Sequence, residues 1–443
     1  MAPFVIFAGS ELKTVAKSGI HACMLAIQRA ATGSSFILSG LDKGMKKSVW
    51  TGSGRLKKLK ILIVNYEFPP LGGGGGVATY DLAIEWKKEA EVHVLTSWFK
   101  GLPFYEEVAG IHVHRARILF RTSRDVATFV SMLSYLVFGF FKGVALCRKH
   151  RFDVINTHFA VPSGPLGHVL SRFFRIPNVL SLHGGDIYDP SKRISPHQHW
   201  FFKRAVRFIL NRADRVIAQS SNTRDNAITY YHPDNEVSVI PLAFHAPKVR
   251  KAARTDLGIS RNEFVLITIG RLIKRKAIDT MINALAKLPD QNITLYIMGD
   301  GPEREFLASL ADQMGLRERV IFLGYVTEEE KYRYLSVADL FVSTSLHEGF
   351  GIVFMESMHF GIPIVCSNYG GQVDFLANEE NALLIDVGDA SACAHSVKRF
   401  YRDRRLYAKC SRNNMKKVHD FYADAVAARY TNIFRELSEK GEN

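Results

Sequence analysis

Short apolar runs, each bounded by turn residues, recur along the chain from residue 59 onward. The first covers Lys60–Asn65, which reads Lys-Ile-Leu-Ile-Val-Asn. Similar runs follow at residues 91–96, 154–157, 179–183, 215–218 and 237–241. Such runs are typical of strands buried on both faces of a parallel sheet. Helical stretches separate them at residues 78–88, 126–149 and 199–211. This alternation predicts a doubly wound α/β domain.

The same scheme begins again after a polar, basic segment at residues 248–261, which we interpret as a linker. The second series has apolar runs at residues 263–270, 293–299, 320–324, 340–343 and 364–366, and helical stretches at 302–314 and 351–360. The sequence therefore predicts a second Rossmann-like domain. Doubly wound sheets bind ligands at the carboxyl ends of their strands, so two such domains that face one another would form a ligand-binding cleft.

The residues before the first strand follow no sustained period. We interpret residues 1–57 as an N-terminal extension that ends in a basic run: a flexible leader, a membrane-surface contact, or an over-long reading of the gene, since Met45 could also be a start. The two domains are expected at residues 58–246 and 247–422.

Composition restricts the class of partner. The chain has 443 residues, of which 47% are apolar and 23% charged, so it can bury a large core and is not a disordered tail. Lys and Arg exceed Asp and Glu by 58 to 43, giving a net charge of +15. This excess implies an anionic partner, which could be nucleic acid, an acidic membrane face or a phosphorylated small molecule.

The cysteines and apolar segments indicate the compartment. The five cysteines are widely separated and form no Cys-x-x-Cys pair, so neither a disulfide framework nor a zinc site is expected from them. The longest uncharged stretch, Val126–Phe141, is shorter than the roughly 20 apolar residues of a spanning helix. The N-terminus lacks the basic region of a secretory signal. We expect a cytoplasmic protein, either soluble or peripheral on the inner face of the membrane.

The densest group of candidate site residues is the segment Glu348–Glu356, which reads Glu-Gly-Phe-Gly-Ile-Val-Phe-Met-Glu and follows an apolar strand. If Gly349 and Gly351 form a loop and Ile352 begins a helix, the backbone N–H groups of the first turn lack intrahelical partners. These N–H groups could bind phosphate or sugar oxygens, and the two carboxylates could bind sugar hydroxyls. The plain alternative is a pair of solvated acids stabilised by the helix dipole.

Two glycine-rich segments follow predicted strands. Gly72–Gly76 lies between the first strand and a helix, as a phosphate-binding loop would. A dinucleotide-binding fold would also place glycines there, but it needs an acid near the end of the second strand, and this strand ends in Val-Leu-Thr-Ser. Gly299-Asp-Gly301-Pro follows another strand, where a tight strand-to-helix connection would explain the same residues.

Together these segments resemble the retaining glycosyltransferases of family 4 (GT4), which have the GT-B fold of two facing Rossmann-like domains and an E-x7-E motif. The resemblance covers about residues 59–438. It implies an α/β fold with an interdomain cleft, an acceptor-binding first domain and a donor-binding second domain. It also implies that the last helix, within residues 423–443, crosses back to the first domain.

The resemblance assigns roles residue by residue. Gly270-Arg271-Leu-Ile-Lys-Arg-Lys276 is similar to the segment that holds the donor's diphosphate, and His183-Gly-Gly-Asp186 to the element whose His lies beside the donor sugar. The residues implied in catalysis are His183, Arg271, Lys276 and Glu348. Those implied in donor binding are Gly74, Gly75, Gly270, Gly299, Gly301, Phe350, Gly351, Ile352, Val353 and Glu356. Asp186 would orient its loop or an acceptor hydroxyl.

Two departures from the family pattern stand out. Ala277 replaces a glycine, so the turn after Lys276 would have to form without positive φ or tilt differently. Pro241–His245 replaces the family's Pro-Asn-Gly-Val-Asp at the predicted interdomain hinge. Taken alone, the Gly270–Lys276 segment is more simply explained as a solvated basic loop, and His183 as a structural histidine.

The implied reaction uses no metal and no cofactor. The sequence shows no evident carboxylate nucleophile for a double displacement. The resemblance implies front-face substitution, in which the leaving phosphate oxygen helps to deprotonate the incoming hydroxyl. Two fixed cations would then take over the role that a metal ion has in other transferases. The donor would be a UDP-, GDP- or ADP-sugar, and the acceptor a glycan or a lipid-linked or envelope polysaccharide precursor.

Two segments combine basic flanks with aromatic residues, at residues 115–149 and 200–207. They suit contact with an anionic membrane surface, although packing on the sheet explains their apolar residues equally well.

Two other functions remain open. The first is a nucleotide-sugar epimerase or hydrolase with the same architecture. The second is a basic, non-enzymatic module that binds membrane or nucleic acid; clustered phosphate-binding residues without base-stacking aromatics argue against nucleic acid.

Overall fold

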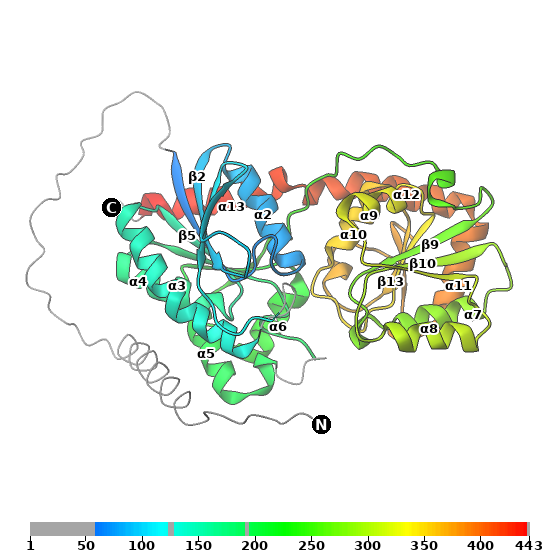
Figure 1. Ribbon diagram of the computed structural model, residues 1–443, viewed down its shortest axis with the longest axis horizontal. Coiled ribbons are helices and arrows are strands. Elements are labelled where there is room, and N and C mark those ends of the chain that lie inside the picture. Colours follow the sequence, from blue (N-terminus) through cyan, green and yellow to red (C-terminus); the bar gives the residue numbers. More distant parts are fainter. Residues whose placement is uncertain (1–57, 123–127, 191–194, 441–443) are drawn as a thin grey trace, which may run out of the picture. The chain divides into compact units, whose positions relative to one another are not determined.

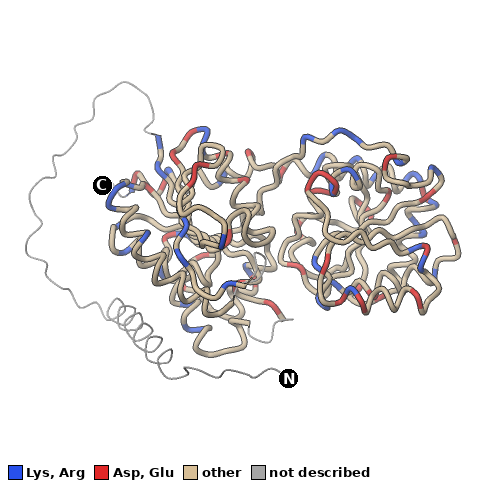
Figure 2. The backbone as a smooth tube through the Cα atoms, viewed as in Figure 1, with Lys and Arg blue, Asp and Glu red and all other residues tan. Residues whose placement is uncertain are grey.

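The computed structural model describes residues 58–122, 128–190 and 195–440, so the predicted N-terminal extension lies outside the described residues. Its strands form two separate sheets, one from the first half of the chain and one from the second (Figure 1). Lys and Arg residues are interspersed with Asp and Glu along both halves (Figure 2). The excess of Lys and Arg over Asp and Glu nevertheless lies in residues 1–246, because residues 247–443 are nearly balanced in charge.

The first sheet has eight strands in the order β3-β4-β2-β1-β5-β6-β7-β8. Every neighbouring pair is parallel except β3 with β4. The central strands are buried along most of their length, as their continuous apolar runs predict. The strands are β1 (Leu59–Asn65), β2 (Ala90–Ser97), β3 (Tyr105–Val108), β4 (Ile111–Ala116), β5 (Val154–His158), β6 (Asn178–Leu182), β7 (Arg215–Ala218) and β8 (Val237–Val239).

Five helices connect these strands: α2 (Gly74–Trp86), α3 (Phe129–Lys149), α4 (Ser163–Phe174), α5 (Trp200–Arg212) and α6 (Ser221–Tyr231). Helix α3 packs closely on α4, since a Cβ atom at Gly139 would lie 2.7 Å from a methyl group of Leu166. Its Tyr135 hydroxyl donates to the backbone of Leu95 in β2. Helix α3 therefore covers one face of the first sheet.

The second sheet has six strands, all parallel, in the order β11-β10-β9-β12-β13-β14. The strands are β9 (Phe264–Ile269), β10 (Ile293–Met298), β11 (Val320–Gly324), β12 (Leu340–Ser343), β13 (Ile364–Ser367) and β14 (Ala382–Ile385). Its helices are α7 (Ile278–Ala286), α8 (Arg304–Gln313), α9 (Glu328–Leu335), α10 (Ile352–His359), α11 (Ala390–Arg402) and α12 (Arg404–Lys417). This strand order is that of a dinucleotide-type Rossmann sheet.

Both sheets have a point where the strand order reverses, between β1 and β5 in the first and between β9 and β12 in the second. Open α/β sheets bind ligands at the carboxyl ends of the strands beside such a point. The loops there contain Gly72 and Gly73 after β1, Phe159 after β5, Gly270 after β9 and Glu348 after β12. The topology thus places most of the candidate residues at ligand-binding positions.

The last helix, α13 (Ala423–Lys440), returns to the first sheet. Its Tyr430 and Phe434 lie in the same hydrophobic cluster as Ile61 and Val94. The indole N–H of Trp86 in α2 donates to the carbonyl of Ala427 at 3.3 Å. This helix is therefore part of the core that supports α2 and the glycine loop.

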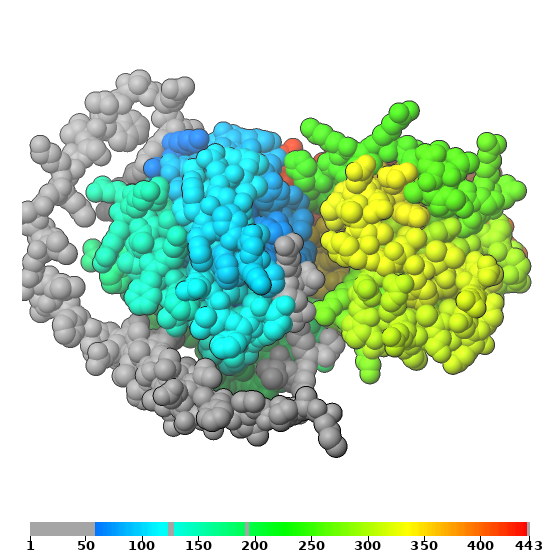
Figure 3. Space-filling model, in the orientation of Figure 1, coloured from blue at the N-terminus to red at the C-terminus, as the bar shows by residue number. Residues whose placement is uncertain are grey.

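The structure differs from the sequence-based expectation in two respects. Strands β3, β4 and β14 were not predicted. Helix α3 covers most of the helix predicted at residues 126–149, but its 21 residues exceed the uncharged stretch Val126–Phe141 that was expected to be too short for a membrane span. It is the one helix among the described residues long and apolar enough to cross a membrane by length and composition. Packing against β2, β4 and α4 accounts for the apolar residues on its inner face. In the space-filling view, the turquoise segment that contains α3 lies at the surface (Figure 3).

Candidate active site

The glycine segment after β1 meets two other parts of the chain. A Cβ atom on Gly75 would lie 2.7 Å from Cζ of Phe159 and 3.1 Å from Nδ1 of His183, so only glycine fits there. A Cβ atom on Gly74 would lie 3.4 Å from Cδ1 of Ile352, which belongs to the second sheet's domain. Helix α2 begins at Gly74, so Gly74 and Gly75 lie in its first turn rather than in a loop as expected.

His183 lies directly after β6 and belongs to a chain of side-chain hydrogen bonds. Its Nε2 is 2.9 Å from Nδ1 of His158, and Nε2 of His158 is 2.6 Å from Oδ1 of Asn156. The ring of Phe159 stacks on His183 at a centroid distance of 4.3 Å. Burial lowers the pKa of His183 to about 3, so the ring is neutral. Its Nδ1, which faces Gly75, has no hydrogen-bond partner among the described residues.

Asp186 holds the loop that carries His183. Its Oδ1 accepts a hydrogen bond from the backbone N–H of His183 at 3.0 Å, and its Oδ2 accepts one from Ala160 at 2.6 Å. The side chain is buried. Asp186 therefore joins the loop after β6 to the loop after β5.

The two halves of the chain contact one another beside this loop. A Cβ atom on Gly184 would lie 3.4 Å from Cα of Gly349. The Ser220 hydroxyl, which caps α6, donates to the carbonyl of Gly349 at 2.8 Å. Asn222 lies 3.1 Å from Nε2 of His347. We call this region, where the 183–184 and 220–222 segments meet the 347–349 segment, the interdomain junction.

Glu348 lies at the junction and binds the basic segment after β9. Its Oε2 is 2.6 Å from Nζ of Lys276 and 3.4 Å from NH1 of Arg275. Arg275 also donates to the carbonyl of His347 at 2.5 Å. Burial alone would raise the pKa of Glu348, but the Lys276 and Arg275 charges outweigh it and lower the pKa to about 2. Arg275 is not among the site residues predicted from the sequence, because its partner Glu348 lies far away along the chain.

Lys276 and Arg271 have different surroundings. The Lys276 side chain passes over the backbone of Gly270, since a Cβ atom there would lie 3.1 Å from Cε of Lys276. Arg271 is exposed, and no described residue forms an ion pair with its guanidinium. Lys276 is thus fixed by Glu348, and Arg271 is available to a ligand.

The turn after Lys276 corrects an expectation. Ala277 itself adopts a left-handed conformation, with φ 46° and ψ 45°, so the turn forms with positive φ despite the lost glycine. A non-glycine residue in this conformation costs about 1–2 kcal/mol. The carbonyl of Ala277 accepts a hydrogen bond of 2.7 Å from the buried hydroxyl of Thr344, which holds the turn against the end of β12.

Helix α10 begins at Ile352 as predicted, and Gly351 before it has φ 89°. Glu356 lies in its second turn and binds partners that the sequence did not indicate. Its Oε1 is 2.7 Å from Nζ of Lys331 and 3.3 Å from the hydroxyl of Tyr332, whereas its Oε2 has no partner among the described residues. Burial raises the pKa of Glu356, and Lys331 opposes this shift. The two carboxylates of the motif therefore bind different cations.

Asp81 of α2 lies close to this second carboxylate. It accepts a hydrogen bond from the backbone N–H of His245 at 3.2 Å. Burial, with the nearby charges of Glu328 and Glu356, raises the pKa of Asp81 to about 7. A carboxyl group that changes charge near neutral pH thus lies where the first domain meets the second.

Three of the predicted donor-binding residues have clear structural roles. A Cβ atom on Gly299 would lie 2.0 Å from the carbonyl oxygen of Gly270, and one on Gly301 would lie 2.3 Å from that of Leu272. Both glycines are therefore required by close backbone approach. The Phe350 ring is buried against Phe375 at 5.2 Å, so only the Phe350 backbone can reach a ligand. Val353 lies in the first turn of α10, half-buried.

Comparison with known proteins gives the family. A family model described as "Glycosyl transferases group 1" matches residues 249–417, and one described as "Glycosyltransferase Family 4" matches residues 72–245. The chain is 28% identical over 412 residues to an uncharacterized glycosyltransferase of Methanocaldococcus jannaschii, covering 86% of this chain and 99% of that protein. It is 33% identical over 200 residues to the lipopolysaccharide core biosynthesis glycosyltransferase LpsD of Rhizobium meliloti, covering 45% of this chain and 57% of that protein.

Solved structures agree on the fold. The crystal structure of the Anabaena protein HepE in complex with UDP matches with a TM-score of 0.70 at 23% identity, and it covers 85% of this chain and all of that one. The sequence-based expectation of the GT-B fold is thereby confirmed.

Proposed function

The chain belongs to glycosyltransferase family 4, and from this premise we propose that it transfers a sugar from a nucleoside diphosphate sugar to a hydroxyl group, with retention and without a metal ion. That it is a glycosyltransferase of the GT-B type follows from the family and the fold. The donor, the stereochemistry and the independence from metal are the proposal.

The cations after β9 are the observation that carries the proposal. Lys276 and Arg275 are held by Glu348, and Arg271 is exposed beside them. A nucleoside diphosphate that leaves the sugar develops negative charge on its β-phosphate. Cations that are already in position stabilise such charge without rearranging in the transition state. These side chains can therefore do what a divalent ion does in other transferases.

The surroundings of His183 support front-face substitution. Asp186, the carboxylate three residues after His183, is held by two backbone N–H groups and is thus unsuited to attack the sugar. In the proposed step the bond between the anomeric carbon and the phosphate oxygen breaks while the acceptor oxygen forms its bond on the same face. The acceptor's proton goes to the departing phosphate oxygen. Nδ1 of His183 can accept a hydrogen bond from a hydroxyl group of the donor's sugar and so position that sugar.

The nucleotide of the donor is proposed from one structural relative. HepE was crystallised with UDP, so UDP-sugars come first, with GDP- and ADP-sugars as the alternatives. The test is a thermal-shift screen of all three classes. A true donor raises the melting temperature because it binds the folded state alone. If no nucleotide sugar does so at millimolar concentration, the proposal is wrong.

The acceptor is proposed to be an envelope glycan or glycolipid precursor at an anionic bilayer, as the relative LpsD acts in lipopolysaccharide core biosynthesis. Phe129 of α3 and Trp200 and Phe201 of α5 are exposed, and Trp200 is exposed by 74%. Phe129 and Phe202 are in ring contact, so the two helix ends form one surface, with Lys203 and Arg204 beside it. Sedimentation with anionic vesicles, but not with neutral ones, would support this surface. Binding to neither kind of vesicle, or equal binding to both, would contradict it.

A further inference from the structure

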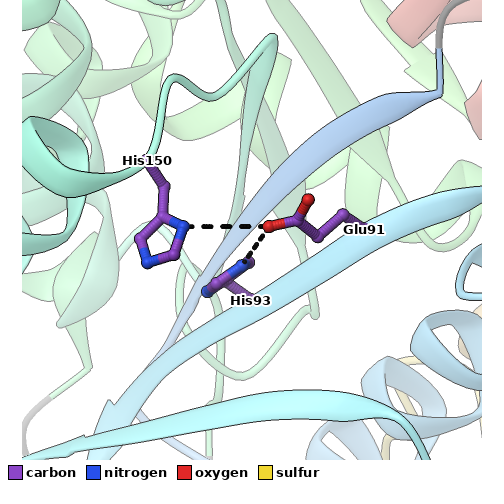
Figure 4. A group of neighbouring side chains, drawn as sticks. All are labelled: Glu91, His93 and His150. Atoms are coloured by element: carbon purple, nitrogen blue, oxygen red, sulfur yellow. Dashed lines mark hydrogen bonds and ion pairs between the residues drawn. The ribbon is translucent and has the colours of Figure 1, made fainter.

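A second cluster of polar side chains lies away from the junction, toward the amino ends of β1 and β2. Glu91 and His93 belong to β2, and His150 directly follows α3. One carboxylate oxygen and one ring nitrogen from each histidine lie within 4.8 Å of one another. Figure 4 shows both rings directed toward the carboxylate of Glu91. The reaction proposed above uses none of these residues.

The strand and the helix end explain why these side chains meet. Residues 91 and 93 are two apart in β2, so their side chains lie on the same face of the sheet. His150 caps α3, and its backbone N–H donates to Leu146 at 2.7 Å, which places the ring over that face. The chain then enters β5. The cluster therefore connects the α3–β5 segment to β2.

The carboxylate is oriented by a second contact. Oε1 of Glu91 lies 3.0 Å from Nε2 of His93 and 3.7 Å from Nδ1 of His150. Its Oε2 lies 3.0 Å from Nζ of Lys60 in β1. Lys60 thus holds one oxygen and leaves the other directed between the two imidazoles.

His93 is oriented in the same manner. Its Nδ1 lies 3.1 Å from Nε2 of His114 in β4, on the far side of the ring from Glu91. If Nδ1–H donates to His114, the lone pair of Nε2 is directed at the centre of the cluster. Metal-binding histidines commonly use their second nitrogen in this way.

We propose that Glu91, His93 and His150 bind one divalent transition-metal ion of the zinc class, with water as the fourth ligand. Two imidazoles and a carboxylate are the donor set such ions prefer, whereas Mg²⁺ and Ca²⁺ prefer oxygen ligands. Ligand atoms about 2.0–2.2 Å from a tetrahedral ion are about 3.4 Å apart. The 3.0 and 3.7 Å separations lie on either side of this value.

The exposure of the ligands leaves room for the water. The side chains of Glu91 and His150 are 30% and 20% exposed, and His93 is 2% exposed. An ion could thus enter from solvent, and His93 would anchor it to the sheet. The site is structural: it lies toward the amino ends of the strands, whereas the proposed reaction takes place at the carboxyl ends. The inference is independent of the proposed function.

Cobalt spectroscopy on the full chain tests the site. The protein, freed of metal by a chelator, is titrated with Co²⁺, and visible d–d absorption reports tetrahedral binding. We expect saturation at one equivalent, displacement by Zn²⁺ and a higher melting temperature with Zn²⁺. His150→Ala and Glu91→Gln should each weaken binding at least about ten-fold. Buried His93 is left unchanged, because its replacement could unfold the sheet.

His395→Ala is the matched control, since His395 is an exposed histidine of α11. It should bind Co²⁺ as the unaltered protein does, and circular dichroism should show all variants folded. Absence of saturable binding would overturn the proposal. So would binding that neither His150→Ala nor Glu91→Gln weakens, because the ion would then lie elsewhere.

Discussion

Nδ1 of His158 lies 2.9 Å from Nε2 of His183, and this contact determines which nitrogen of His183 can bind a ligand. The amide nitrogen of Asn156 donates to the carbonyl of Val179, so the Asn156 oxygen is the acceptor for Nε2–H of His158. Nδ1 of the neutral His158 then accepts from Nε2–H of His183. His183 is left with a lone pair on Nδ1, directed toward Gly75.

Replacing His158 should therefore act on the reaction through His183. In His158→Phe the Nε2–H of His183 loses its acceptor and the tautomer is no longer fixed, so we expect kcat to fall about 10- to 100-fold with little change in donor affinity. The decisive measurement is a double variant. If His158 acts through His183, His158→Phe with His183→Ala is no slower than His183→Ala alone. If the rate losses of the two single variants multiply in the double variant, His158 has a separate role.

Glu348→Gln should reduce transfer by at least about 100-fold, because Lys276 and Arg275 lose the charge that positions them. Steady-state kinetics with a circular dichroism spectrum separates lost activity from lost fold. Glu329→Gln is the matched control, since Glu329 is an exposed glutamate of α9. Full activity of Glu348→Gln would show that the ion pair has no part in the reaction.

Asp81 gives a prediction for stability against pH. Its pKa is raised to about 7 in the folded protein, above the usual value of a free aspartate. The folded state therefore binds the proton more tightly than the unfolded state. The stability this provides is complete below about pH 4 and is lost as the pH rises through 7. Asp81→Asn keeps a neutral side chain and so lacks this pH-dependent loss. Its free energy of unfolding, relative to that of the parent, should therefore rise by on the order of 2 kcal/mol from pH 5 to pH 8. A pH-independent difference would contradict the assignment.

The parts of the fold that the sequence predicted are those whose signal is local. Strands such as β1 and β9 are buried on both faces, and their continuous apolar runs reveal them. Strand β4 was missed because it reads Ile-His-Val-His-Arg-Ala, without a continuous run, and β3 is exposed on alternate residues. The glycines at Gly74 and Gly75 resembled a loop, yet helical hydrogen bonding begins at Gly74.

The candidate site shows the same limit. Glu348, Glu356 and Lys276 lie in recognisable segments, so the family resemblance found them. The partners of Glu348, Glu356 and His183 were not predicted, since Arg275, Lys331 and His158 acquire these roles only when distant segments pack together. The positions of the predicted residues are now known. Their roles in catalysis stay predictions.

The central claim is that protein cations, and no divalent ion, stabilise the departing diphosphate. It is tested most directly by the rate of transfer from the donor, with and without excess EDTA, for the parent protein and Arg271→Ala. His150→Ala is included so that loss of an ion from the Glu91 site is not mistaken for loss of a catalytic metal.

The account predicts that EDTA leaves the parent rate unchanged, and that Arg271→Ala, fully folded, is slower by about 100- to 1,000-fold. Activity that disappears with EDTA while the protein stays folded, and that Mg²⁺ or Mn²⁺ restores, would contradict it.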